Sequence, residues 1–230
     1  MKLQDVGGVH NINLVTPEHM VPQVVLSLLK AKELGLRLPV VYNTSSFDSL
    51  ESIELLDGLV DVYLADFKVW EQGTSRRLMK AEDYAKVASE SIQAMHKQVG
   101  DLCFTSDGLA KRGVLLRHLV MPGHEEEGKH IVRWLAENIS KDLYIHVMEQ
   151  YSPRAHVGKG KRGKTGRAGD VADGIIEPGG SAATSAAKKD VRYADINRAV
   201  SDDEVNSVKK AAADAGLWRF VEAAEHGGFM

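Results

Sequence analysis

The chain has 230 residues, of which 43% are apolar and 27% charged, and its 29 lysines and arginines nearly balance its 32 aspartates and glutamates, a composition typical of a globular protein. No run approaches the roughly 20 apolar residues that a membrane-spanning helix needs, and the start lacks the apolar core of a secretory signal, so we expect a cytoplasmic protein without a membrane partner. The single cysteine, Cys103, excludes a disulfide framework, and it excludes a zinc site or iron–sulfur cluster held by three or four thiolates of this chain.

Five apolar runs predict β-strands, and each run is too uniformly apolar to be half-exposed. The runs are residues 10–16, 39–44, 60–67, 113–120 and 142–149. Such strands, separated by helical patterns, are typical of parallel strands that are covered on both faces and joined by right-handed βαβ connections. The sequence therefore predicts an α/β fold with parallel strands, as an open sheet or a barrel.

Helical patterns between these strands carry start and stop residues. In the first helix Thr16 is placed to cap, Pro17 stands at a first helical position, and Pro22 indicates that the regular helix starts later. Further helices are expected near residues 48–57, 81–99 and 125–138, and from the capping-box pattern Ser201–Glu204 to Gly216.

Residues 154–190 differ from the rest of the chain because they hold eight lysines and arginines, four acidic residues and eight of the 21 glycines. A segment of this kind cannot bury enough surface to offset its ordering entropy, so it predicts a flexible insert. RNA binding is an outside alternative, but without interleaved aromatic side chains a solvated loop is the better interpretation, and we do not expect nucleic acid as a partner. The expected domains are a barrel at 1–153, this insert, and a C-terminal helix and tail at 191–230, in which Trp218 and Phe220 pack on the body.

Polar side chains gather where the predicted strands end, which is where parallel α/β folds bind their ligands. In chain order these ends carry Thr16, Asn43-Thr44-Ser45, Asp66-Phe67-Lys68, Arg117 and Glu149-Gln150-Tyr151. We therefore expect a binding site at this edge.

Asp66 and Lys68 stand two apart on one predicted strand, so their side chains leave from the same face. There Asp66 would take a hydroxyl or a cation, and Lys68 would neutralise a carboxylate or phosphate. Arg117 is also expected to point inward, and its guanidinium suits a carboxylate. The alternative is an internal salt-bridge network that only satisfies itself.

Other polar residues admit a functional and a structural interpretation. Asn43 and Thr44 offer oxygens to a hydroxyl or a monovalent cation near Asp66, or they form a turn that caps the next helix.

The histidines and the cysteine fit structural roles better. We expect packed, hydrogen-bonded core positions for three polar residues of the first strand, which are His10, Asn11 and Asn13. His118 and His146 are single imidazoles without metal-ligand spacing. Cys103 is expected to be a semi-buried thiol at the amino ends of the strands.

Four motifs follow one another at the ends of successive predicted strands: VYNTS, YLADFK, RHLVMPG and VMEQY. In this order the chain resembles the radical S-adenosylmethionine (SAM) superfamily, and within it an uncharacterised branch similar to pyruvate formate-lyase activating enzyme. The resemblance covers residues 3–153 and 192–220 and leaves the insert outside it.

This resemblance implies a partial (β/α)6 barrel of the TIM type whose open mouth holds a 4Fe-4S cluster and SAM. It implies that Asp66 and Lys68 contact the ribose and carboxylate of SAM and that Arg117 lies beside SAM. Asn43-Thr44-Ser45 stands where the family has a sequence linked to a monovalent cation, and Thr16 stands in for the Gly-Gly-Glu that grips the SAM amino group.

The family's C-x3-C-x2-C cluster loop would precede His10, and it is absent from this sequence. We therefore expect an N-terminally truncated barrel whose cluster ligands lie on a missing segment, or a barrel that has lost the cluster. With the segment present, the implied activity is reductive cleavage of SAM to a 5′-deoxyadenosyl radical that abstracts hydrogen, with a protein as the implied substrate of activating enzymes.

Two further hypotheses remain open at this point. One is a barrel lyase in which Lys68 forms a Schiff base with a carbonyl substrate. The other is a non-catalytic remnant that binds a partner or RNA through residues 154–190.

Overall fold

The computed structural model describes residues 1–160 and 191–221. The chain divides into two compact units, one formed by Met1–Tyr151 with Val200–Met230 and one by Ser152–Ala199. In the second unit the described residues include the short 3₁₀ helix η3 (Ala194–Ile196) and a β-bridge between Gly160 and Val191. Residues 161–190, most of the predicted insert, lie outside the described part.

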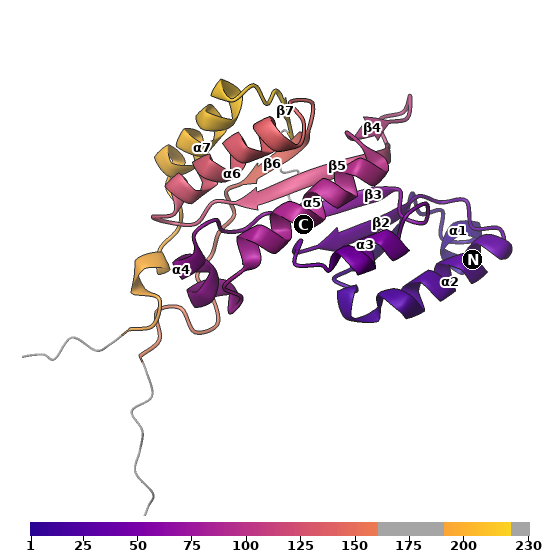
Figure 1. Ribbon diagram of the computed structural model, residues 1–230, viewed down its shortest axis with the longest axis horizontal. Helices are drawn as coiled ribbons and strands as arrows, with labels where there is room; N and C mark the ends of the chain where they lie inside the picture. Colours follow the sequence, from indigo (N-terminus) through magenta and orange to yellow (C-terminus); the bar gives the residue numbers. More distant parts are fainter. Residues whose placement is uncertain (161–190, 222–230) are drawn as a thin grey trace, which may run out of the picture. The chain divides into compact units, whose positions relative to one another are not determined.

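The first unit is built on a mostly parallel β-sheet (Figure 1). Across the sheet the parallel strands run in the order β1 (Ile12–Val15), β2 (Val40–Thr44), β3 (Val62–Asp66), β5 (Ala110–Leu119), β6 (Tyr144–Met148) and β7 (Arg219–Phe220). A short strand, β4 (Cys103–Phe104), pairs antiparallel with β5. All five predicted strands are confirmed, and the predicted α/β class of a partial barrel with parallel strands is confirmed as well.

Helices follow the strands in alternation. They are α1 (Lys2–Asp5), η1 (Glu18–Met20), α2 (Val21–Glu33), α3 (Leu50–Leu55), α4 (Gln72–Thr74), the π-helix η2 (Ser75–Met79), α5 (Tyr84–Val99), α6 (Glu125–Asn138) and α7 (Asp202–Asp214). The predicted capping box of α7 is present, since Ser201 and Glu204 bond each other's backbone. The prediction that Thr16 caps the first helix is wrong. The short helix η1 begins at Glu18, and its N-cap residue is Pro17.

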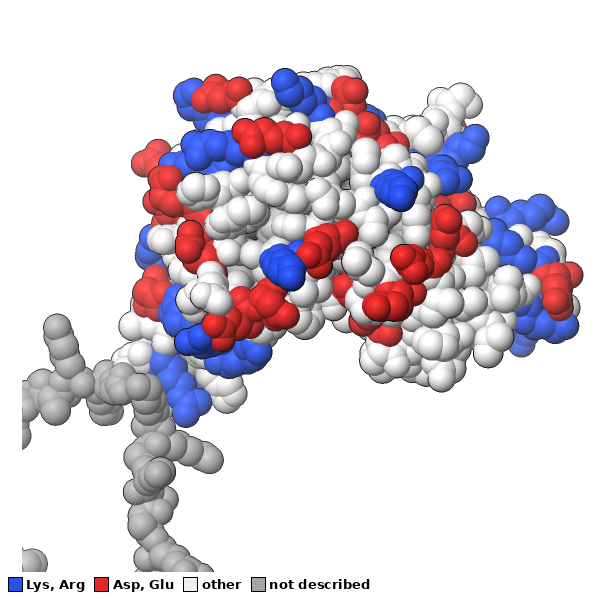
Figure 2. Space-filling view, viewed as in Figure 1, with Lys and Arg blue, Asp and Glu red and all other residues white. Residues whose placement is uncertain are grey.

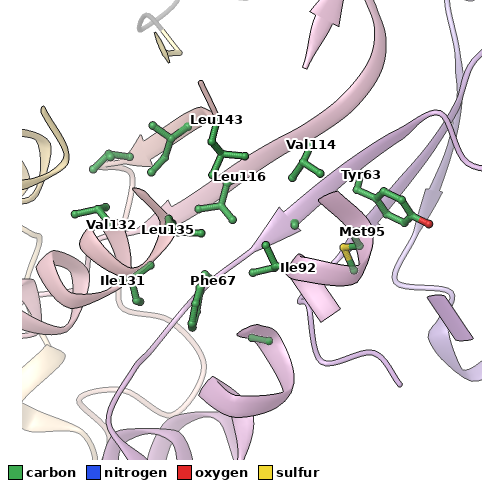
Figure 3. Packing of buried hydrophobic residues seen from close by; sticks show 14 of the residues in the cluster. Tyr63, Phe67, Ile92, Met95, Val114, Leu116, Ile131, Val132, Leu135 and Leu143 are labelled. Carbon is green, nitrogen blue, oxygen red and sulfur yellow. The ribbon is translucent and has the colours of Figure 1, made fainter. Parts of the chain in front are cut away.

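One face of the sheet, here called the helical face, packs against the helices and holds the main core. Figure 3 shows Val114 and Leu116 of β5 pointing toward Ile92 of α5 and Leu135 of α6. All four side chains are almost fully buried. Over the helices, acidic and basic side chains are mixed on the outer surface (Figure 2). Among the described residues, no helix is long and apolar enough to cross a membrane.

The opposite face, here called the open face, is only half-buried, which corrects the prediction of strands covered on both sides. Burial alternates along β5 and β6, with every second side chain of their later residues partly exposed. Near its amino ends a small apolar cluster of Val41, Val62 and Leu102 covers this face. Toward the carboxyl ends its side chains remain accessible, as a ligand site requires.

Several predictions about packing are wrong because the residues lie at the margins of the sheet. His10, Asn11 and Asn13 are exposed rather than packed, because β1 is an edge strand. Trp218 is 65% exposed and donates a hydrogen bond to Asp142, whereas Phe220 packs against the core as predicted. Cys103 lies at the predicted amino end of the sheet, but it is exposed.

Helix α6 approaches the sheet closely at Gly128. A Cβ at this position would lie 2.6 Å from Nε2 of His118 and 3.0 Å from Cγ2 of Val208. His118 cannot move aside freely, because it is buried and its Nδ1 lies 2.8 Å from the carbonyl oxygen of Phe67. The close approach of α6 therefore requires glycine.

We predict that Gly128→Ala lowers the free energy of unfolding by about 1–3 kcal/mol, although alanine favours helix, because overpacking outweighs propensity. Chemical denaturation measures the change. Gly73→Ala is the matched control, since nothing lies within 4 Å of its added Cβ, and it should be neutral or slightly stabilising. Equal stability of the two variants would contradict the packing argument.

Candidate functional site

Three polar side chains meet on the open face at the carboxyl ends of neighbouring strands. Asn43 lies on β2, Asp66 on β3 and Arg117 on β5. The strand register pairs Asp66 with Arg117, and side chains paired in a parallel sheet share a face. Lys68 follows two residues after Asp66, so its side chain returns to the same face.

These groups form one hydrogen-bonded network. The Lys68 ammonium lies 2.5 Å from Oδ2 of Asp66, and Nε of Arg117 lies 2.6 Å from Oδ1 of the same carboxylate. A second nitrogen of Arg117 donates to Oδ1 of Asn43 at 2.7 Å. The side chains of Asp66, Lys68 and Arg117 therefore converge on one face of the sheet, as the sequence predicts.

The network is partly shielded from water but still reachable. The side chains of Asp66, Arg117 and Lys68 are 14%, 24% and 34% exposed. Partial burial strengthens each charge interaction relative to bulk water, and exposure leaves a path for a ligand. Such a site offers cations to a ligand carboxylate and an anion to a ligand hydroxyl or amine.

His146 lies beside Arg117 on the open face, although its position in the sequence predicted no role in a site. The register of β5 with β6 pairs the two residues directly. Burial lowers the pKa of His146, and the positive charges of Arg117 and Lys209 lower it further. The imidazole therefore favours its neutral form, which can donate and accept hydrogen bonds. Only the register between strands could have revealed this neighbour.

The structure does not bring Thr44 or Thr16 to this network. Thr44 faces the helical side, where its hydroxyl donates to Asp48. Thr16 is exposed at the end of β1, where its backbone N–H donates to the carbonyl of Asn43. Its φ of 51° is a left-handed conformation that is costly for a β-branched residue.

A second polar cluster lies behind β2, on the helical side. Asp48 is 1% exposed and accepts hydrogen bonds from the hydroxyls of Tyr42 and Thr44. Glu18 accepts the backbone N–H of Ser49 next to it. Burial raises the pKa of Asp48, and the negative charge of Glu18 raises it further. The hydrogen bonds from Thr44 and Tyr42 lower it, but the net result is a pKa of about 6.

An iron–sulfur cluster does not fit the residues of this chain. Cys103 is the one thiol, and it lies on β4, opposite Arg112 near the amino end of β5, away from the carboxyl edge. In the described ranges no three histidine, cysteine or acidic side chains are grouped to hold a metal ion. SAM itself does fit by chemistry, because its amino acid carries a carboxylate and an ammonium and its ribose carries hydroxyls, which match Lys68, Arg117 and Asp66.

No protein-family model matches the chain. An uncharacterized protein of Methanocaldococcus jannaschii is 33% identical over 131 residues, which are 56% of this chain and 34% of that protein. The chain thus spans about a third of the length of this curated relative.

Among solved structures, a domain of pyruvate-formate lyase-activating enzyme from Bacteroides vulgatus superposes with a TM-score of 0.57 at 10% identity. The superposition covers 93% of this chain and 98% of that domain. At this identity the likeness shows the fold, and the chain shares the partial-barrel fold of that domain. In this partial barrel the network of Asn43, Asp66, Lys68 and Arg117 occupies the carboxyl edge of the open face.

We predict that the buried carboxyl of Asp48 makes the protein less stable as the pH rises from about 4 to about 6. Its pKa is higher in the fold than in the unfolded chain, so the stabilisation is present at low pH and is lost on ionisation, by on the order of 2 kcal/mol. Asp48→Asn should remove this part of the pH dependence in denaturation series. Glu54→Gln, at an exposed position of α3, should keep it. An unchanged slope in Asp48→Asn would refute the prediction.

Proposed function

We propose that this chain binds SAM on the open face of its partial barrel, as part of a radical SAM protein of the activating-enzyme-like kind. The observation that carries the proposal is the network in which Asp66 holds both Lys68 and Arg117 at the carboxyl edge. The radical SAM-like fold supports it independently, because ligands of parallel α/β folds lie at this edge.

Each residue of the network would take a defined part of the cofactor. Lys68 and Arg117 would bind the carboxylate of the amino-acid moiety, since guanidinium and ammonium groups both pair with carboxylates. Asp66 would accept from the ribose hydroxyls or balance the ammonium. Asn43 would keep the guanidinium oriented through its 2.7 Å hydrogen bond.

The radical chemistry of the proposed class needs a 4Fe-4S cluster that the thiol of this chain does not hold, so we assign these residues binding and orientation of SAM and no redox step. The cluster would have to take its ligands from outside these 230 residues. A protein substrate is the partner that the activating-enzyme-like placement implies.

The Schiff-base hypothesis for Lys68 has less support. An amine that forms a Schiff base must be free to attack a carbonyl carbon, and the Lys68 nitrogen is already engaged by Oδ2 of Asp66 at 2.5 Å. We therefore predict that borohydride with pyruvate or a simple aldehyde gives no adduct at Lys68 beyond that at exposed Lys111. Peptide mapping measures this, and selective trapping at Lys68 would favour the lyase.

We predict that the chain binds SAM in isothermal titration and that Asp66→Asn and Arg117→Met each weaken binding at least about tenfold, which corresponds to loss of one charge-assisted hydrogen bond. Asp214→Asn is a matched control, because it removes an acid whose ion pair with Lys210 lies on the exposed surface of α7. The control should bind like the wild type.

Two results would overturn the proposed function. One is absence of SAM binding by the wild-type chain at millimolar ligand. The other is binding that Asp66→Asn and Arg117→Met leave unchanged. Titration with S-adenosylhomocysteine, which lacks the sulfonium charge, separates recognition of the amino-acid and ribose groups from recognition of that charge.

A further inference from the structure

After Asp66, the last residue of β3, the chain continues through an irregular segment, residues 67–71, that carries Lys68 and then turns into α4. Its side chains alternate, because Phe67 and Val69 are fully buried while Asp66 and Lys68 lie partly exposed. Outside regular structure, backbone N–H and carbonyl groups need other partners. The N–H of Phe67 still donates to the carbonyl oxygen of Arg117 on β5 at 2.9 Å, and buried side chains from α5, β5 and α6 bond further groups of the segment.

The Tyr84 hydroxyl, from the first residue of α5, is the first of these partners. It accepts the N–H of Lys68 at 3.0 Å and lies 2.9 Å from the carbonyl oxygen of Ser45 and 3.1 Å from that of Asp66. It thus joins the ends of β2 and β3, the two strands that carry Asn43 and Asp66. The Tyr84 side chain is buried, and burial raises the pKa of its hydroxyl, so it remains a neutral donor and acceptor.

His118 bonds the other end of the peptide group whose N–H Tyr84 accepts, the one between Phe67 and Lys68. Its Nδ1 lies 2.8 Å from the carbonyl oxygen of Phe67, so that nitrogen carries a proton and donates. The imidazole is 2% exposed, and burial lowers its pKa, which favours the neutral ring.

Glu127 holds the end of the segment. One oxygen of its carboxylate accepts the N–H groups of Trp70 at 2.7 Å and Glu71 at 2.9 Å, and the other lies 2.9 Å from Nδ1 of His124. Burial alone would raise the pKa of Glu127, but hydrogen bonds from His124, Thr74 and these two backbone groups outweigh it and lower the pKa to about 2. The carboxylate therefore stays charged.

We propose that Tyr84 is a positioning residue for the cofactor site, which sets the placement of Asp66 and Lys68 by fixing the backbone between them to the end of β2. This inference rests on the proposed function. Tyr84 does not reach the open face, so it acts through the two residues whose peptide groups it bonds. His118 bonds the carbonyl of the peptide group between Phe67 and Lys68, and Glu127 accepts the N–H groups of Trp70 and Glu71, so these two side chains help to hold the segment.

A second buried tyrosine, Tyr63, provides a matched control for removal of the Tyr84 hydroxyl. Tyr63 is also fully buried, and its hydroxyl bonds Oε1 of Gln98 at 2.7 Å, near the start of β3 and away from the carboxyl edge. Tyr84→Phe and Tyr63→Phe each remove one buried hydroxyl that has hydrogen-bond partners. Both variants should lose similar stability, so a difference in ligand binding reports on position in the site.

The test combines two measurements on wild type, Tyr84→Phe and Tyr63→Phe. Amide hydrogen exchange at Lys68 should accelerate about tenfold in Tyr84→Phe alone, because its N–H loses its acceptor. SAM affinity, measured by titration calorimetry, should fall at least about fivefold in Tyr84→Phe and stay within about twofold of wild type in Tyr63→Phe.

The outcomes separate the two proposals. Faster exchange at Lys68 in Tyr84→Phe with SAM affinity unchanged would overturn the positioning role, and so would equal loss of affinity in both variants. Unchanged exchange would also overturn it. If the wild type binds no SAM, the proposed function fails, and the positioning role that rests on it is overturned with it, whereas the exchange data still report whether Tyr84 fixes this backbone.

Discussion

The carboxylate of Asp66 lies between two cations, and this pairing ties β3 to β5 and, through Arg117 and Asn43, to β2. A carboxylate that is 14% exposed requires such partners, because an unpaired charge at this depth would be strongly destabilising. The same partners are suited to a ligand that carries both signs of charge. The network that completes the fold at this edge is therefore also the group of side chains that a zwitterionic cofactor would engage.

Placement of that network depends on groups that never face it. Beyond the bond from the N–H of Phe67 to the carbonyl oxygen of Arg117, peptide groups of the segment after β3 bond the hydroxyl of Tyr84, the imidazole of His118 and the carboxylate of Glu127. These side chains come from α5, β5 and α6. Buried polar networks of this kind define one geometry, because every unmade bond would leave a costly orphaned group.

Binding chemistry and redox chemistry are separated in this chain. The polar groups suited to SAM gather at the carboxyl edge, whereas the one thiol, Cys103, is exposed on β4 near the amino ends. The likeness to a domain of pyruvate-formate lyase-activating enzyme, at 10% identity, concerns the fold. The charged network, which comes from this chain's own contacts, supplies the independent ground for a cofactor site.

The sequence by itself determined the five longer strands, the main helices and the shared face of Asp66 and Lys68, because local periodicity and two-residue spacing carry that information, whereas the two-residue strands β4 and β7 were not predicted. It could not separate Asn43 from Thr44, which leave β2 on opposite faces, since nothing local says which face is covered. Tertiary structure alone decided that the open face stays accessible, that His146 stands beside Arg117, and that the Tyr84 hydroxyl reaches the end of β3. Those relations depend on strand register and helix packing between residues far apart in the chain, and no local pattern encodes them.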